Sequence, residues 1–103
     1  FNSLENGNLK YKFKNYKKFI KYLKNKNIDV ILFLTPYHNE SYSLTTKQNK
    51  LLNSIEEQFL DFGNKNSIGI LGSYDPEKVG CINADFYDYM HPNTVCINKI
   101  VNK

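Results

Sequence analysis

The residues best suited to chemistry lie near the end of the chain, in the segment 85–92 (Asp-Phe-Tyr-Asp-Tyr-Met-His-Pro). Asp88 stands three residues before His91, and Pro92 follows in a position that suits the first turn of a final helix. On one tight turn, an aspartate at this spacing can hold one imidazole nitrogen and leave the other free to take a proton from a nucleophile. Such a pair is two thirds of a hydrolytic triad. The local pattern is equally compatible with a simple turn in which Asp88 caps the loop and His91 lies at the surface.

The hydrophobic pattern predicts two strands and the helices around them. The near-continuous apolar run 28–34 predicts a strand buried on both faces, as in a parallel sheet, and 67–71 predicts a second short buried strand. A helix is expected from Leu9, where apolar residues recur at steps of three and four. Another is expected over 45–62, with Thr45 and Gln48 as a capping box and Gly63 as its C-cap.

This alternation predicts an α/β fold, specifically part of a three-layer, flavodoxin-like parallel sheet with flanking helices. Two strands do not form a stable sheet by themselves, so further strands are expected from the remainder of a parent domain or from another chain. We therefore interpret residues 1–103 as one partial domain with a loose leader at 1–8, and the start at Phe1 suggests an excised piece.

The charge distribution argues against two classes of partner. The net charge is +4, but eight of the fourteen Lys lie between Lys10 and Lys26, and the chain has no Arg, the residue most used for bidentate nucleic-acid contacts. We interpret these lysines as the solvated face of a helix that covers the sheet, and we favour this interpretation over a binding patch for anionic lipid or nucleic acid. We therefore expect no nucleic-acid partner. No apolar run is long enough to cross a bilayer, so we also expect no membrane association through this segment.

The two cysteines, Cys81 and Cys96, lack the Cys-x-x-Cys spacing of a structural zinc site. They could form a disulfide in an oxidising compartment, but we favour two unpaired thiols. A metal site built from both histidines with Asp85 and Asp88 is conceivable, but no spacing supports it. We predict no metal and no cofactor.

Three polar clusters should meet at one rim of the sheet, because ligands of such folds bind outside the carboxyl ends of the strands. The clusters are 35–38, 72–75 and the Asp88/His91 loop. Within them, His38 could line a substrate cleft, although a solvated loop histidine is the more common case. Ser73 follows a strand and Gly72, so it could contact substrate or act as nucleophile, but an ordinary strand-to-loop turn is favoured.

The second half of the chain resembles the C-terminal part of the SGNH (GDSL-like) hydrolases. The resemblance rests on the strand ending at 34–37 (Leu-Thr-Pro-Tyr), the strand ending at 70–76 (Ile-Leu-Gly-Ser-Tyr-Asp-Pro), and the Asp-x-x-His-Pro block in 86–93 before a final helix. Within this family, the segment is most similar to the branch of bacterial cell-envelope esterases and O-acyltransferases.

The resemblance implies that His91 is a general base and Asp88 its orienting carboxylate. It implies an ester or acylated carbohydrate substrate and an extracytoplasmic, cell-envelope location. The family's Gly-Asp-Ser nucleophile block, oxyanion glycine block and Gly-x-Asn-Asp block have no counterpart in this sequence, so they are expected upstream of residue 1. The alternative is a non-catalytic SGNH-like module used for packing or partner binding.

Overall fold

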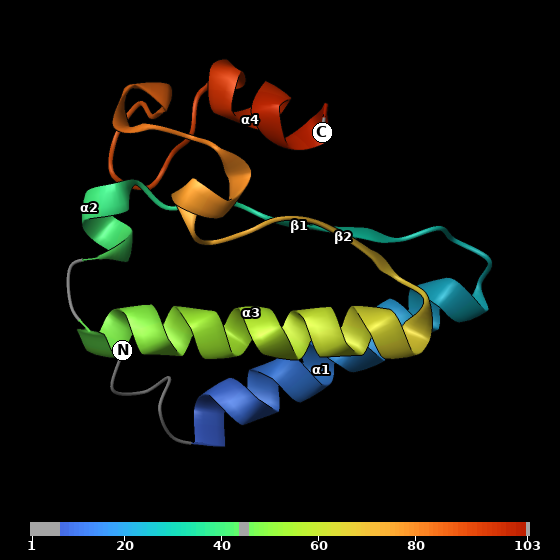
Figure 1. The fold of residues 1–103 in the computed structure, drawn as a ribbon. Coiled ribbons are helices and arrows are strands. Elements are labelled where there is room, and N and C mark those ends of the chain that lie inside the picture. The colour runs from blue at the N-terminus through green and yellow to red at the C-terminus, as the bar shows by residue number, and fades with distance from the viewer. Residues whose placement is uncertain (1–6, 44–45, 103) are drawn as a thin grey trace. The chain divides into compact units, whose positions relative to one another are not determined.

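The computed structural model describes residues 7–43 and 46–102 of the chain. Two compact units emerge, residues 1–30 and residues 31–103. The first unit contains α1 (Gly7–Asn25), and the second contains all other elements (Figure 1). These are β1 (Ile31–Leu34), α2 (Asn39–Tyr42), α3 (Thr46–Asn66), β2 (Gly69–Gly72), α4 (Thr94–Val101) and the 3₁₀ turns η2 (Pro76–Val79) and η3 (Asn83–Asp85). The predicted order of helices and strands is confirmed, with α2 and the two 3₁₀ turns as additions.

Helix α1 begins at Gly7, two residues before the predicted start, and residues 1–6 of the predicted leader lie outside the described residues. It contains no acidic residue in its first turn and ends on a lysine-containing last turn. The helix stops because Asn27 adopts a left-handed conformation (φ 62°), which lets the Ile28 N–H donate to the Leu23 carbonyl at 3.1 Å. This is a Schellman-type end, for which asparagine is the usual substitute for glycine.

Strands β1 and β2 are adjacent and parallel, with Leu32 paired to Ile70 and Leu34 to Gly72. Helix α3 connects them, so the predicted parallel pair with a helical crossover is confirmed. Each strand has four residues, and β1 begins at Ile31 instead of residue 28. The paired register runs from Ile31 opposite Gly69 to Leu34 opposite Gly72, so residues 28–30 have no partner in β2.

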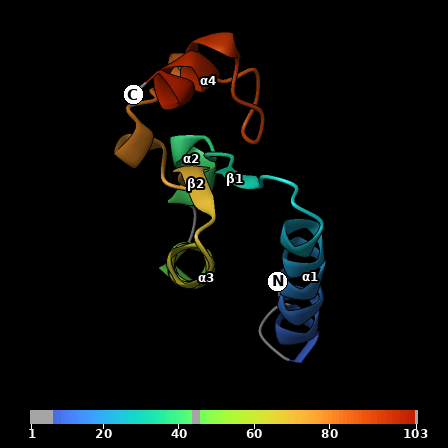
Figure 2. The same ribbon diagram turned by 90° about the vertical axis from the view of Figure 1, so that its right-hand side faces the viewer.

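The prediction that both strands are buried on both faces is wrong for β2, in which no residue is fully buried and Leu71 is 39% exposed, and also for β1. The side chains of β1 alternate: Leu32 and Leu34 are buried, whereas Ile31 is 66% exposed and Phe33 is 38% exposed. Helices α3 and α4 lie on opposite sides of the strand pair (Figures 1 and 2). Leu32 shares a face with its register partner Ile70, which lies against α3. The opposite face, which carries Ile31 and Phe33, is only partly covered within the second unit.

Gly63 is not the C-cap of α3, because the helix continues through it to Asn66. A Cβ at Gly63 would lie 2.7 Å from Ile70 Cδ1 and 2.8 Å from the Ile68 carbonyl oxygen. This glycine therefore permits close approach between helix and strand. The helix ends where Ser67 takes φ 55° and the Ile68 N–H donates to the Gly63 carbonyl at 2.9 Å. The predicted capping box at its other end involves Thr45, which lies outside the described residues.

Pro92 lies before the last helix and does not form its first turn, because α4 begins at Thr94. Asn93 is the N-cap: its Oδ1 accepts from the backbone N–H groups of Val95 (3.0 Å) and Cys96 (3.2 Å). Pro92 instead forms an isolated antiparallel bridge with Phe86, which closes the loop between them. Within the described part of the chain, no helix combines the length and apolar character needed to cross a membrane.

Candidate functional site

Asp88 and His91 face each other across a tight turn. His91 Nδ1 lies 2.8 Å from both carboxylate oxygens of Asp88. The turn is held by the Met90 N–H, which donates to Asp88 Oδ1 at 2.8 Å, and by the Tyr87 N–H, which donates to the His91 carbonyl at 2.8 Å. The hydrogen bond predicted from the Asp-x-x-His spacing is therefore confirmed.

This geometry defines what each group can do. The Met90 N–H, followed by the His91 ring, lowers the pKa of Asp88, so its carboxylate is charged at neutral pH. A carboxylate at Nδ1 favours the tautomer with hydrogen on that nitrogen, which leaves Nε2 as a proton acceptor. The His91 side chain is 73% exposed, so the ring is open to solvent.

A pocket of about 300 Å³ adjoins this turn and is formed mainly by aromatic side chains. Asp88 lines it, whereas His91 does not, so the second half of the prediction, an imidazole nitrogen facing a cleft, is not confirmed. His38 lines the same pocket and makes edge-to-face contacts with Phe86 (5.4 Å between ring centroids) and Tyr89 (5.2 Å). The described residues that line the pocket are His38, Asn83, Phe86, Tyr87, Asp88 and Tyr89.

The three polar clusters predicted at the carboxyl ends of the strands do converge. The Tyr37 N–H donates to the Tyr74 carbonyl at 3.1 Å, and the two rings stack with centroids 5.9 Å apart. The His38 N–H donates to the Tyr89 carbonyl at 3.1 Å, which docks the Asp88/His91 loop beside α2. His38 also caps α2, because its Nδ1 accepts from the Glu40 N–H at 3.1 Å. The histidine thus combines a structural bond at Nδ1 with a ring that forms a pocket wall.

Ser73 is buried and its hydroxyl is engaged within the protein. Its Oγ donates to Glu56 Oε1 at 2.7 Å and accepts from the Asp75 N–H at 3.1 Å. Glu56, buried on α3, also accepts from the Tyr74 N–H at 2.8 Å and lies 3.5 Å from Lys78 Nζ. These contacts match the strand-to-loop turn favoured for Ser73, and a substrate contact would require them to break.

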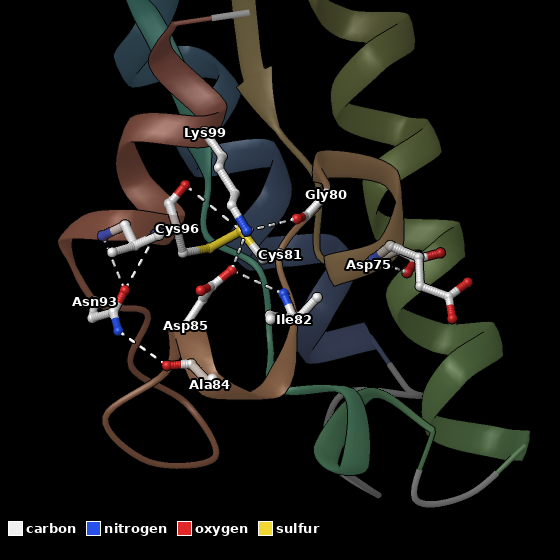
Figure 3. The surroundings of a disulfide bond; sticks show 11 residues. Asp75, Gly80, Cys81, Ile82, Ala84, Asp85, Asn93, Cys96 and Lys99 are labelled. Atoms are coloured by element: carbon white, nitrogen blue, oxygen red, sulfur yellow. Dashed lines mark hydrogen bonds and ion pairs between the residues drawn. A yellow bond between two sulfur atoms is a disulfide. The ribbon is translucent and has the colours of Figure 1, made fainter.

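Cys81 and Cys96 form a disulfide with a Cα–Cα distance of 5.3 Å (Figure 3). Our preference for unpaired thiols is wrong, because the fold brings the residue that follows the C-cap of η2 next to α4. The disulfide belongs to a small apolar cluster with Val79, Ile100 and the partly buried Phe86. The two cysteines are fifteen residues apart in the sequence, and this spacing alone does not predict that they pair.

Asp85 is the buried anchor of the same region. Its Oδ2 accepts from Lys99 Nζ at 2.6 Å and from the Ile82 N–H at 3.0 Å (Figure 3). Hydrogen bonding from Lys99, and then from Ile82, lowers the pKa of Asp85. Lys99 Nζ also donates to the Gly80 carbonyl at 3.2 Å, so this one ammonium group links α4 to the C-cap of η2 and to the last residue of η3.

The sequence analysis did not identify several residues of the site. The aromatic pocket walls Phe86, Tyr87 and Tyr89 flank Asp88, and their density in that segment was the available signal. Glu56 stands four residues after Leu52 and three before Phe59, on the apolar side of its helix, and a carboxylate in such a position signals a buried partner. Among the described residues, no three His, Cys, Asp or Glu side chains are grouped so that they could bind a metal ion.

Comparison of the chain with family models, curated proteins and solved structures found no match. The functional interpretation therefore depends on the geometry of the site and on the motif resemblance.

Proposed function

We propose that Asp88 and His91 are the base pair of an SGNH-type ester hydrolase or O-acyltransferase. The observation that carries the proposal is the contact of His91 Nδ1 with both Asp88 oxygens at 2.8 Å, on a turn that adjoins a pocket. The segment resembles the last block of the family, in which these two residues have these roles. The nucleophilic serine is proposed to come from sequence outside these 103 residues.

In this mechanism His91 Nε2 takes the proton of the serine hydroxyl as the oxygen attacks the ester carbonyl. The resulting imidazolium is stabilised and oriented by the Asp88 carboxylate, which does not itself become protonated. His91 then returns the proton to the departing alkoxide, leaving an acyl-serine. Water completes hydrolysis, whereas an acceptor hydroxyl completes acyl transfer, and in both cases His91 takes the proton of the incoming group.

The exposure of His91 indicates what the rest of the enzyme would add. A general base works best where water is excluded and oxyanion donors are fixed in place. The remainder of the parent domain, or another chain, would cover the ring and supply the serine. The same partner would cover the face of β1 that carries the exposed Ile31 and Phe33. The proposed substrate is an ester or an acylated carbohydrate.

The disulfide supports an extracytoplasmic, cell-envelope location for this proposal. Stable disulfides persist in oxidising compartments and are rare where glutathione and thioredoxin keep thiols reduced. The Cys81–Cys96 bond is buried, as expected of a structural disulfide.

The proposal is tested by ester turnover in the parent protein. By comparison with other serine hydrolases, His91→Ala should lower kcat on the order of 10⁶-fold and Asp88→Asn on the order of 10⁴-fold. Asp61→Asn is a matched control, because it removes the same charge from an exposed i,i+4 pair with Lys65 in α3, and it should leave kcat unchanged. Full activity in His91→Ala would remove the assignment.

The 103-residue chain by itself should hydrolyse p-nitrophenyl acetate no faster than free imidazole, because the proposal places the serine elsewhere. Turnover that is lost on Ser73→Ala would instead make Ser73 the nucleophile, despite its buried hydrogen bonds.

The second candidate is a non-catalytic SGNH-like module that packs against a partner. The exposed Ile31 and Phe33 on one face of β1 favour it, because exposed apolar strand faces invite association. A parent sequence without a Gly-Asp-Ser block after a strand would select this candidate.

A further inference from the structure

The segment closed by the Cys81–Cys96 disulfide contains almost the whole candidate site. The bond joins residues fifteen apart, and between them lie five of the six pocket-lining residues as well as His91. Among the described residues that line the pocket, His38 alone lies outside this closed segment. One covalent bond therefore constrains the conformation of the segment that forms most of the site.

Besides the disulfide, the ends of this segment are joined by Lys99, by a small apolar cluster and by Asn93. The Asn93 N–H donates to the Asp85 carbonyl at 2.8 Å, and Asn93 Nδ2 donates to the Ala84 carbonyl at 3.3 Å. Lys99 Nζ bonds the Gly80 carbonyl at 3.2 Å and Asp85 at 2.6 Å, and the apolar cluster around Cys96 is small. The Phe86–Pro92 bridge and the Tyr87-to-His91 hydrogen bond lie within the loop, so they do not fix its ends. Contact between the loop and α2 depends on the His38 N–H and on the His38 ring.

The disulfide is buried, and Cys81, which is 6% exposed, is the half of it nearer to solvent. Cys96 is fully buried, but Cys81 lines a surface pocket of about 240 Å³ together with Pro76, Glu77 and Ile82. Attack by a small dithiol from this pocket requires a local opening that uncovers the Cys81 sulfur.

We propose that Cys81 and Cys96 are redox-controlled positioning residues, whose disulfide holds the Asp88/His91 loop on α2 and whose reduction releases it. A thiolate of a dithiol reductant attacks Cys81 Sγ, the S–S bond breaks, and Cys96 leaves as a thiolate. The second thiolate of the reductant then attacks the mixed disulfide and releases Cys81. The reductant supplies two electrons and becomes a disulfide, and its two protons end on the cysteine thiolates. As a control of catalysis this inference rests on the proposed function, but the loop movement does not.

Three backbone amides separate loop release from general destabilisation. The His38 N–H reports docking of the loop, because it bonds Tyr89, and the Tyr87 N–H reports closure of the turn. The Ile68 N–H, bonded to Gly63 at the end of α3, is the control. Hydrogen exchange at each is measured by NMR on the oxidised chain, after dithiothreitol, and after reoxidation.

Opening a loop of this length should speed exchange at His38 and Tyr87 on the order of 100-fold. Exchange at Ile68 should remain near its oxidised rate, and reoxidation should restore protection. The Cys81→Ser/Cys96→Ser variant should behave as the reduced chain and should not respond to dithiothreitol.

Unchanged exchange at His38 and Tyr87 after complete reduction would overturn the proposal, since Lys99 and the apolar cluster would then suffice to hold the loop. Equal acceleration at all three amides would also overturn it, because the bond would then stabilise the whole unit without controlling the loop. These readouts do not involve ester turnover, so an inactive parent protein would refute the proposed function and leave this inference standing.

Discussion

Asp85→Asn tests how the Asp88/His91 loop is anchored. The Asp85 side chain is only 8% exposed, and its Oδ2 accepts from Lys99 Nζ at 2.6 Å and from the Ile82 N–H at 3.0 Å. Asparagine preserves the shape and can still accept from Ile82. It removes the charge, so the Lys99 ammonium loses its ionic partner.

The expected cost follows from burial. Removing one partner of a fully buried ion pair costs about 3–5 kcal/mol, and a hydrogen bond to a charged group contributes about 1.5–3 kcal/mol. Lys99 is 37% exposed, so water replaces part of the lost interaction. We therefore expect the free energy of unfolding to fall by about 2 kcal/mol at neutral pH.

The effect should depend on pH with a defined sign. The pKa of Asp85 is lower in the folded chain than in the unfolded chain, first because of Lys99 and then because of Ile82. Its contribution is therefore fully present above the unfolded pKa of about 4 and is lost as the pH falls through the folded value. The difference between wild type and Asp85→Asn should shrink in that acidic range.

Urea unfolding followed by circular dichroism, at neutral pH and at successively lower pH, measures both quantities. Asp61→Asn is the control, because its 3.0 Å pair with Lys65 is exposed and should contribute less than about 1 kcal/mol. The reasoning fails if Asp85→Asn costs no more than the control at neutral pH. It also fails if the cost remains undiminished in acid, since the loss would then come from packing.

Two further substitutions test the elements beside the site. Glu56→Ala should cost about 2–3 kcal/mol, because it leaves the buried Ser73 hydroxyl and a backbone N–H without their acceptor. Glu56→Gln should cost less in thermal unfolding, because its amide oxygen can still accept, and equal losses would contradict this account. Gly72→Ala should lower the free energy of unfolding by at least about 2 kcal/mol, because Gly72 has φ 85° and a Cβ would overlap the Leu34 carbonyl oxygen. Gly69→Ala, whose Cβ would meet only Ile31 Cγ1 at 3.8 Å, should be near neutral, and a comparable loss there would refute the steric explanation.

The sequence predicted the parts of the fold that depend on local pattern. The apolar periodicity located α1, α3 and α4, and the strand–helix–strand order correctly predicted that β1 and β2 are parallel neighbours. The Asp-x-x-His spacing predicted the side-chain contact because both residues lie on the same turn.

Features that depend on packing between distant segments were not predictable from local pattern. Gly63 looked like a helix end, but its role is to admit Ile70 from β2. The Cys81–Cys96 disulfide and the Asp85–Lys99 bond form because α4 folds back on the loop. The spacing of these residues in the sequence does not reveal that they are in contact. Burial of β1 on both faces was overestimated because an apolar run indicates what a strand can bury, not what covers it.

The central claim is that His91, oriented by Asp88, activates a serine nucleophile. Its most direct test is the rate at which a fluorophosphonate probe labels the parent protein, with the modified residue located by mass spectrometry. We predict a single serine adduct outside these 103 residues, formed rapidly in the wild type and in Asp61→Asn, slowly in Asp88→Asn, and not detectably in His91→Ala. Labelling of His91→Ala at the wild-type rate would contradict the account.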